Sequence, residues 1–374
     1  MTHRTIAASG GVVPAWKERL WEAVLDCDEF TAVDLVDAVL DEGVDPESFL
    51  LDVVAPVQAR VGAEWAANRL TVAQEHAATA INERVVAALA LHPAARRTSR
   101  SAAPAGRVTV ACIDGEWHAL PARILAEVLR LRGWQVDFLG AQVPTHHLIA
   151  HIHRTAPQVV GLSSSIPTRL PTAHAAVTAC QATGTPVLVG GAAFGPGGRY
   201  AEILGADAWA PDARAAAELI PTIAPRSPAP QQAAIDDLPH LADQEYTMVS
   251  RTAGTLVKSV MAGLEERFPA MASYTPKQRG HTAEDIAHIV TFLATALYVD
   301  EERLFTDFVD WTAGILTVRG VPAVSLVPTL ELLTQELSDF PRARAMITAA
   351  HERLTAPPTD NAGPAHPHDH GKPA

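Results

Sequence analysis

The sequence predicts an α/β domain with a parallel sheet, set between two segments that are helical throughout. Between residues 106 and 221, short β-branched or aliphatic runs alternate with amphipathic stretches. This is the pattern of a flavodoxin-like (Rossmann-like) sheet covered by helices on both faces. Over 13–92 and 240–355, apolar residues recur at helical spacing instead. The expected domains are therefore a four-helix bundle at 13–92, the α/β domain at 106–221 and a helical domain at 240–355.

The composition fits a globular chain and excludes several classes of protein. The 374 residues are 48% apolar and 19% charged, enough for two or three domains with cores of their own. The net charge of −13 argues against sequence-independent nucleic-acid binding, which needs a basic face. No uncharged apolar stretch reaches the ~18 residues of a membrane span, and the N-terminus lacks the apolar core of a signal peptide. We therefore expect a cytoplasmic protein.

The N-terminal segment has the periodicity of a helical bundle. Helical spacing relates Trp16, Leu20, Val24 and Cys27. The pattern Thr31-x-x-Asp34 is typical of a capping box and predicts the start of a second helix, which Gly43 ends. Two further helices are expected over 46–68 and 71–91. Short loops between four helices predict an antiparallel bundle.

The middle of the chain alternates between the two periods. Strands are expected over 108–113, 134–139, 158–163, 186–190 and 206–210. Helices are expected over 119–132, 145–155, 168–183 and 212–220. Stretches rich in Pro and Ala at 92–106 and 221–239 are expected to be linkers. The tail at 356–374 is His- and Pro-rich, and we expect it to be disordered, with adventitious metal binding possible.

The loop after the first expected strand presents a possible metal ligand. Glu116 precedes His118 by two residues, at the carboxyl end of a strand. Open α/β sheets bind their ligands at this edge. A metal-bound His usually gives its other ring nitrogen to a carboxylate, which fixes the tautomer. His118 is thus the candidate ligand and Glu116 its orienting group, although on these residues alone an exposed loop His without a ligand is the more common case.

Residues further along the chain favour a metal ligand. Ser163 ends the third strand, 42 residues after Pro121, and Gly190-Gly191 ends the next strand. This order resembles the cobalamin-binding signature Asp-x-His-x-x-Gly, then Ser-x-Leu, then Gly-Gly. The resemblance implies that His118 is the lower axial ligand of cobalt.

The same resemblance assigns further roles. Ser163, Ser165, Gly190 and Gly191 would line the slot for the displaced nucleotide base, and Trp117 would contact the cobalamin. The chain departs from the signature at Glu116, Pro121 and Ser165, where the family has Asp, Gly and Leu. The first departure keeps the carboxylate, while the other two leave details of the slot open.

A second motif lies in the bundle, where nine residues separate Trp65 from Glu75-His76. The spacing resembles the Trp-x9-Glu-His motif of light-sensing, adenosylcobalamin-binding proteins. It implies that the bundle caps the upper face of the corrin and that these side chains surround the adenosyl group. The alternative is a core Trp with an exposed Glu-His pair. Ala66 stands where light-dependent repressors of this family have a His that can ligate cobalt after photolysis, so such capture would need another residue, such as His76.

The last helical segment resembles the biliverdin-binding, globin-like domain that follows the cobalamin-binding domain in photocobilins. The resemblance rests on 288–293, 304–311 and 319–322. It implies a pocket with aromatic walls, cations at its mouth and an imidazole toward the pyrroles. The implied residues are Phe292, Phe305, Phe308 and Trp311 for the walls, Arg319, Arg279 or Lys277 for the propionates, and His281 or His288 for the pyrroles. For each residue, a core aromatic or a solvated charge is the alternative.

The Cys and His residues outside these motifs add little. No Cys follows Cys180, so biliverdin would be bound non-covalently unless an earlier Cys reached it. The three Cys residues have no metal or disulfide spacing. His147 and His151 stand four residues apart on an expected helix and are a further possible metal pair.

Together these patterns favour a light sensor that binds adenosylcobalamin and biliverdin. Photolysis of the cobalt–carbon bond would change the conformation and the quaternary structure of a homo-oligomer. No catalytic domain and no helix-turn-helix is recognisable, so we expect a signalling partner of unknown identity rather than an enzymatic output or nucleic-acid binding. The alternative is a corrinoid methyl carrier of a methyltransferase system. A mutase is disfavoured because no substrate barrel is present, and a helical interaction module that has lost cobalamin binding remains possible.

Overall fold

The computed structural model describes residues 12–103, 105–224 and 238–356. These residues divide into two compact units, which comprise 12–165 with 172–224, and 166–171 with 238–356. The predicted tail beyond 356 and most of the predicted linker at 221–239 lie outside the described residues.

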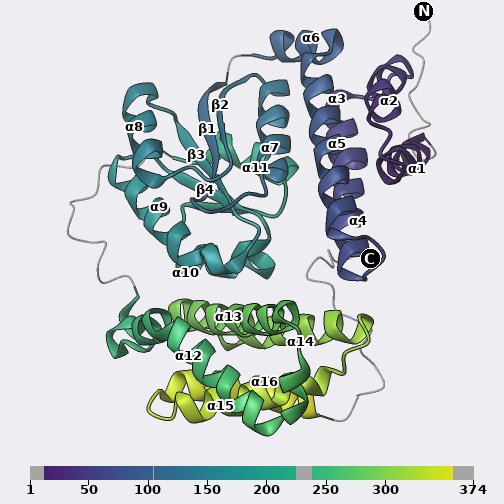
Figure 1. Cartoon of the computed structure of the whole chain (residues 1–374). Coiled ribbons are helices and arrows are strands. Elements are labelled where there is room, and N and C mark those ends of the chain that lie inside the picture. The colour runs from purple at the N-terminus through teal and green to yellow at the C-terminus, as the bar shows by residue number, and fades with distance from the viewer. Residues whose placement is uncertain (1–11, 104, 225–237, 357–374) are drawn as a thin grey trace, which may run out of the picture. The chain divides into compact units, whose positions relative to one another are not determined.

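The first unit begins with the expected bundle (Figure 1). Its helices are α1 (Val12–Leu25), α2 (Glu29–Asp41), α3 (Pro46–Phe49), α4 (Ala55–Ala66) and α5 (Val72–Leu91). A wide π-type turn, Leu50–Val54, joins α3 to α4. The core contains fully buried Leu20, Phe49 and Val85, which explains the apolar periodicity of the segment.

Two predictions for the bundle were wrong. Helix α2 begins at Glu29 rather than at Thr31, because the Asp28 side chain accepts hydrogen bonds from the backbone N–H of Thr31 (3.0 Å) and from its hydroxyl (2.6 Å). The expected linker at 92–106 contains helix α6 (Pro93–Ser101). Pro93 occupies the first turn, where a missing N–H costs nothing, and Ala and Arg residues then favour the helix.

The α/β domain has the predicted parallel sheet. Its strands are β1 (Gly106–Cys112), β2 (Trp134–Gly140), β3 (Val159–Ser163), β4 (Val187–Gly190) and β5 (Ala208–Ala210). They lie in the order β2-β1-β3-β4-β5, and each neighbouring pair is parallel. This is the flavodoxin-like order, and its topological switch point lies between β1 and β3.

Helices cover both faces of the sheet, as predicted. They are α7 (Leu120–Leu131), α8 (Thr145–Thr155), α9 (Leu170–Ala182), α10 (Arg199–Ile203) and α11 (Ala213–Leu219). Helices α7 and α11 lie on the face toward α5, and α8 and α9 lie on the opposite face (Figure 1). Arg132 after α7 donates to the Glu47 carboxylate of α3, at 2.6 and 3.0 Å, and so ties the bundle to the sheet domain.

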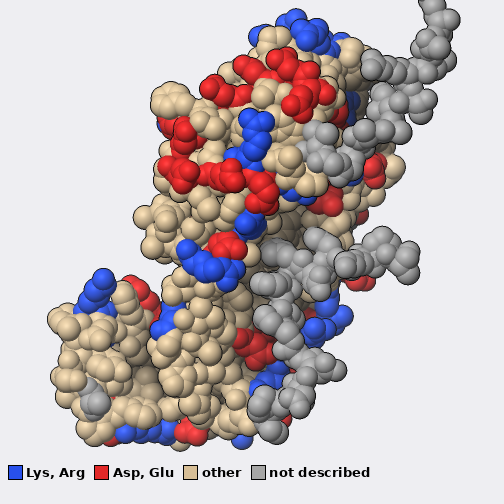
Figure 2. All heavy atoms as spheres, turned by 90° about the vertical axis from the view of Figure 1, so that its right-hand side faces the viewer, with Lys and Arg blue, Asp and Glu red and all other residues tan. Residues whose placement is uncertain are grey.

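Acidic side chains gather over the part of the first unit that contains α1 and α2 (Figure 2). The exposed carboxylates on and beside α2 include Asp26, Asp28, Asp34, Asp37 and Asp41. A face of this sign repels polyanions. Among the described residues, none of the helices combines the length and the apolar character that crossing a bilayer requires.

The second unit is helical, as predicted, and whether it is globin-like stays a prediction. Its helices are α12 (Glu245–Arg267), α13 (Pro276–Val299), α14 (Glu302–Val318), α15 (Val327–Glu336) and α16 (Pro341–Thr355). Apolar residues at helical spacing form the core, including fully buried Val260, Leu293, Leu297, Leu330 and Ile347.

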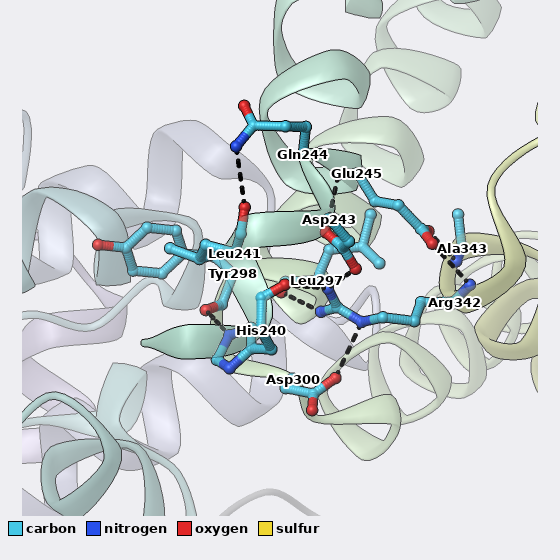
Figure 3. Close-up of polar contacts among 10 residues, drawn as sticks. All are labelled: His240, Leu241, Asp243, Gln244, Glu245, Leu297, Tyr298, Asp300, Arg342 and Ala343. Carbon is cyan, nitrogen blue, oxygen red and sulfur yellow. Dashed lines mark hydrogen bonds and ion pairs between the residues drawn. The ribbon is translucent and has the colours of Figure 1, made fainter. Parts of the chain in front are cut away.

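One guanidinium ties together several segments of this unit (Figure 3). Arg342, at the start of α16, donates to acceptors that lie 42 or more residues away in the sequence. The acceptors are the Leu297 carbonyl (2.5 Å), the Asp243 carboxylate (2.6 Å), the His240 carbonyl (3.1 Å) and the Asp300 carboxylate (3.1 Å). Arg342 therefore fixes the start of α12 and the end of α13 against α16.

The same corner holds a buried carboxylate. Glu245 is only 3% exposed, and its two oxygens accept from the backbone N–H groups of Arg342 (3.0 Å) and Ala343 (2.8 Å). It thus caps the first turn of α16, where a negative charge is favourable.

Candidate functional site

The strand ends at the switch point bring together residues that are far apart in the sequence. Cys112 of β1 pairs with Ser163 of β3, which pairs in turn with Gly190 of β4. The chain continues this alignment beyond the strands, since the N–H of Ile113 donates to the Ser163 carbonyl (3.1 Å). The loop that carries His118 therefore leaves the sheet beside the predicted serines and glycines.

Glu116 and His118 form a tightly bonded pair in this loop. The His118 Nδ1 lies 2.6 Å from the Glu116 Oε1, which also accepts from the His118 backbone N–H at 2.9 Å. An ionised carboxylate can only accept, so the Nδ1 carries the hydrogen. The Nε2 is left with a lone pair on a side chain that is 36% exposed. This is the arrangement in which an imidazole is a good metal ligand.

The carboxylate of this pair is buried and held from its other side. Glu116 is 0% exposed, and its Oε2 accepts from the Ser165 N–H (2.7 Å) and the Ser164 hydroxyl (3.1 Å). Desolvation opposes ionisation, but the hydrogen bonds from His118 and Ser165 outweigh it and lower the pKa of Glu116 to about 2. Sequence reasoning missed Ser164, although three consecutive serines at a strand end were a visible signal.

The conformation of Gly191 keeps the serine loop close. Its φ is +99°, and a Cβ there would lie 2.3 Å from the Ser164 carbonyl oxygen. Only glycine fits such an approach. The N–H of Ser164 donates to the Gly190 carbonyl at 3.1 Å. The pair of glycines therefore positions the loop that holds Glu116.

The predicted bundle residues lie on two neighbouring helices. Trp65 is near the end of α4 and packs against the bundle core, while Glu75 and His76 are in the first turns of α5. The His76 Nδ1 lies 2.6 Å from the Glu75 Oε2. This repeats the arrangement at His118, with a carboxylate holding one ring nitrogen and leaving the other available.

Trp117 brings the two motifs together. Its ring centroid lies 4.3 Å from that of His118 and 5.8 Å from that of His76. Trp117 is 49% exposed, which is unusual for a large aromatic side chain. A row of three rings thus crosses from the loop after β1 to helix α5.

The donors of this region fit a cobalt that a macrocycle already coordinates. The described part of the chain contains no group of three or more His, Cys, Asp or Glu residues that could hold a metal ion by themselves. A corrin needs only one imidazole below the metal, and His118 with its buried carboxylate supplies one. The absence of a side chain at Gly191 lets the Ser164 backbone lie against it and so keeps the serine loop beside His118 and Glu116.

The other His and Cys residues have different surroundings. The His151 Nε2 lies 3.1 Å from the Asp137 carboxylate, and its Nδ1 lies 3.2 Å from an Arg154 nitrogen. Both ring nitrogens are engaged, which argues against the possible metal pair with His147. Burial raises the pKa of the Cys112 and Cys180 thiols to about 12, with Glu116 adding to the shift at Cys112, and so makes both thiols unreactive.

In the second unit, part of the predicted aromatic set is in contact. Phe292 of α13 and Phe308 of α14 stack with centroids 3.6 Å apart, and Trp311 lies 6.3 Å from Phe308. Phe305 is fully buried, whereas Trp311 is 41% exposed. Of these aromatics, Trp311 is the most exposed, and Phe292 is partly exposed.

The predicted polar partners of biliverdin fall into two groups. The charges of His281, His288 and Arg319 act on the Asp285 carboxylate, so these residues share one region of α13 and the end of α14. The Arg279 guanidinium instead pairs with the Glu265 carboxylate and donates to the Met271 carbonyl. Lys277 is exposed.

Comparison with protein families agrees with a cobalamin site at His118 and Glu116. Residues 106–219 match a family model described as B12 binding domain, and residues 16–90 match a second model with the same description. The first match covers the sheet domain and the second covers the bundle. These matches support a cobalamin cofactor, as predicted from the sequence.

Individual relatives come from two kinds of protein. The chain is 32% identical over 187 residues to the HTH-type transcriptional repressor CarH of Myxococcus xanthus, and 34% identical over 205 residues to CarA of the same organism. These matches cover 48% and 50% of this chain, and 58% and 64% of the relatives, which is less than two thirds of their length. A trimethylamine corrinoid protein of Methanosarcina barkeri is 25% identical over 150 residues, 40% of this chain and 68% of that protein.

Among solved structures, the monomethylamine corrinoid protein of Methanosarcina barkeri matches with a TM-score of 0.49. It is 18% identical, and the match covers 56% of this chain and 99% of that one.

Proposed function

We propose that the chain is a light-sensing photoreceptor that binds adenosylcobalamin in its first unit and biliverdin in its second. The observation that carries the first half is the row of rings from His118 through Trp117 to His76. In this row the rings of His118 and His76 both lie near that of Trp117, although 42 residues separate the two histidines in the sequence. A simple corrinoid carrier has no need for a Trp-x9-Glu-His motif at that position.

In this proposal, each group of residues would have its own role in binding adenosylcobalamin. The bound adenosylcobalamin supplies a cobalt–carbon bond that light can break. His118 would hold the cobalt through Nε2, and Glu116 would keep the imidazole in the tautomer with Nδ1–H. Gly190, Gly191 and the serine loop accommodate the nucleotide tail. Trp65, Glu75 and His76 would contact the adenosyl group, and its loss would remove packing from the bundle.

Loss of that packing would then bias a two-state element, namely the seating of the bundle on the sheet domain. We propose that this change alters the contacts of a homo-oligomer and is read by a partner protein. The acidic face over α2 argues against nucleic acid as the direct partner of the first unit (Figure 2). The composition favours a cytoplasmic location.

Biliverdin in the second unit would extend the absorbed range to longer wavelengths. The support is the aromatic group of Phe292, Phe308 and exposed Trp311, with His288 and Arg319 at the same end of the helices. A flat tetrapyrrole needs apolar walls and cations for its propionates. No Cys lies in this unit, so the chromophore would be held without a thioether.

The second candidate is a corrinoid methyl carrier, favoured by the similarity to the trimethylamine corrinoid protein. Absorption spectra of the purified protein separate the two candidates. The protein would be mixed with adenosylcobalamin and biliverdin and measured in the dark, after green light and after red light. A cobalamin change under green light and a shifted red bilin band support the photoreceptor. Stable adenosylcobalamin in the light would overturn it, and cobalamin binding without biliverdin would remove the second chromophore.

A further inference from the structure

A partly buried chain of hydrogen bonds leads from Asn82 in the core of the bundle to Glu75. The Asn82 side-chain N–H donates to the Gln58 carbonyl oxygen at 2.8 Å. The Gln58 N–H donates to the Thr79 hydroxyl at 2.8 Å, and that hydroxyl donates to the Glu75 Oε1 at 3.0 Å. The other Glu75 oxygen holds the His76 Nδ1 at 2.6 Å. Glu75, Thr79 and Asn82 share one face of α5, and Gln58 faces them from α4.

The direction of this chain is determined at its carboxylate end. An ionised carboxylate accepts only, so the Thr79 hydroxyl must donate to Glu75 and accept from Gln58. The Gln58 carbonyl must then point toward Asn82 and accept from its N–H. The order of donors and acceptors along the chain thus fixes the orientations of the Gln58 and Asn82 side-chain amides.

The arrangement leaves one acceptor without a partner. Asn82 is 0% exposed, and its Oδ1 has no hydrogen-bond partner among the described residues. A buried, half-satisfied amide is unfavourable compared with an apolar side chain of the same shape. The Asn82 amide is therefore only half satisfied in the bundle core, and stability alone does not account for the chain of polar groups.

We propose that Asn82, Gln58 and Thr79 are positioning residues that fix the Glu75 carboxylate and, through it, hold His76 in the Nδ1–H tautomer. The Nε2 of His76 is then a hydrogen-bond acceptor toward whatever lies beside Trp117. This inference rests on the proposed function for its purpose, because an adenosyl group offers hydroxyl and amino donors there. The tautomer itself is a property of the chain without any cofactor.

The test uses Thr79→Val, which keeps the shape of the side chain and removes the hydroxyl, with Thr79→Ser as the conservative variant. In the full-length protein labelled with 15N-histidine, at a pH where histidine is neutral, the nitrogen shifts report the tautomer of His76. A His76→Ala spectrum identifies the resonance. We expect Nδ1–H in the wild type and in Thr79→Ser, and a shift toward Nε2–H in Thr79→Val. An unchanged tautomer in Thr79→Val, or Nε2–H in the wild type, would overturn the inference.

A second measurement concerns cobalamin selectivity in the dark. Titration with adenosylcobalamin and with hydroxocobalamin gives the ratio of the two affinities. We expect Thr79→Val to reduce the preference for adenosylcobalamin by about threefold to tenfold, the effect of one lost hydrogen bond, and Thr79→Ser to keep it. An equal loss for both cobalamins would mean a structural role only and would contradict the inference. If the wild type has no preference, or is insensitive to light, the proposed function fails while the tautomer result still stands.

Discussion

Replacing Gly191 with Ala tests the close approach on which the cobalamin site depends. The new Cβ would lie 2.3 Å from the Ser164 carbonyl oxygen, on a residue with a φ of +99°. Ordinary contacts of this kind begin near ~3.5 Å, so the serine loop must move by about 1 Å. The matched control is Gly43→Ala, because Gly43 has a φ of +83° but nothing within 4 Å of the added Cβ.

The two substitutions share one cost and differ in another. A left-handed conformation costs a residue with a side chain about 1–2 kcal/mol, and this is the whole cost expected at Gly43. At Gly191, displacement of the loop also weakens the bonds from Ser164 to Gly190 and from Ser165 to Glu116, which adds about 2–3 kcal/mol. The total of about 3–5 kcal/mol predicts a fall in Tm of about 6–20 °C for a unit of this size, against about 2–8 °C for the control.

Thermal unfolding followed by circular dichroism, with a cobalamin titration below both transitions, measures the two effects. We expect Gly191→Ala to bind cobalamin at least about tenfold more weakly, since Glu116 loses its support, and Gly43→Ala to bind normally. The reasoning would be refuted if both variants unfolded at the same temperature, or if Gly191→Ala bound cobalamin as the wild type does.

Three further predictions follow from other contacts. Glu116→Gln removes the charged acceptor of His118, and we expect the affinity for hydroxocobalamin to fall about 10–100-fold in a spectroscopic titration. The control is Glu22→Gln at an exposed position, which should leave this affinity unchanged. Arg342→Met leaves the Asp243 and Asp300 carboxylates without their partner, and urea unfolding should show the second unit destabilised by about 2–4 kcal/mol, with the first unit unaffected. Desolvation opposes ionisation of Asp243, but hydrogen bonds from Arg342 and the Glu245 N–H hold the pKa of Asp243 below its usual value. The ionised Asp243 therefore contributes to stability above pH ~4, and this contribution is lost as the pH falls through the lowered pKa. We expect the difference in Tm between wild type and Asp243→Asn to shrink from pH 6 to pH 3. A difference in Tm that stayed constant over this range would contradict the assignment.

The sequence predicted the sheet and the neighbourhood of His118 for a physical reason. In a parallel sheet the carboxyl ends of all strands lie at one edge, so residues that follow strands in the sequence meet in space. This brought Ser163, Gly190 and His118 together without any knowledge of distances. The role of Ser164 depended on which way a hydroxyl points after the strand, and periodicity carries no such information.

Contacts between remote segments were beyond the reach of sequence patterns. The Arg342 cluster joins residues from the start of α12, the end of α13 and the start of α16, and no local pattern connects them. The polar chain through Gln58 and Asn82 was missed for the same reason, because it depends on how α4 and α5 face each other. Helix α6 was missed because its high content of Pro and Ala was interpreted as that of a linker. Pro is in fact common in the first turn of a helix.

The position of Trp117 gives the protein an optical probe of its own. Indole emission is quenched when a ligand that absorbs at the emission wavelength binds nearby, and the quenching is strongest for the indole that lies closest to the ligand. Trp117 touches the rings of both His118 and His76, so it would lose its fluorescence when a corrin occupies the site. The chain has seven tryptophans, and the difference between wild type and Trp117→Phe isolates the emission of this one. Arrival and departure of the ligand can therefore be followed in real time without a label attached to the protein.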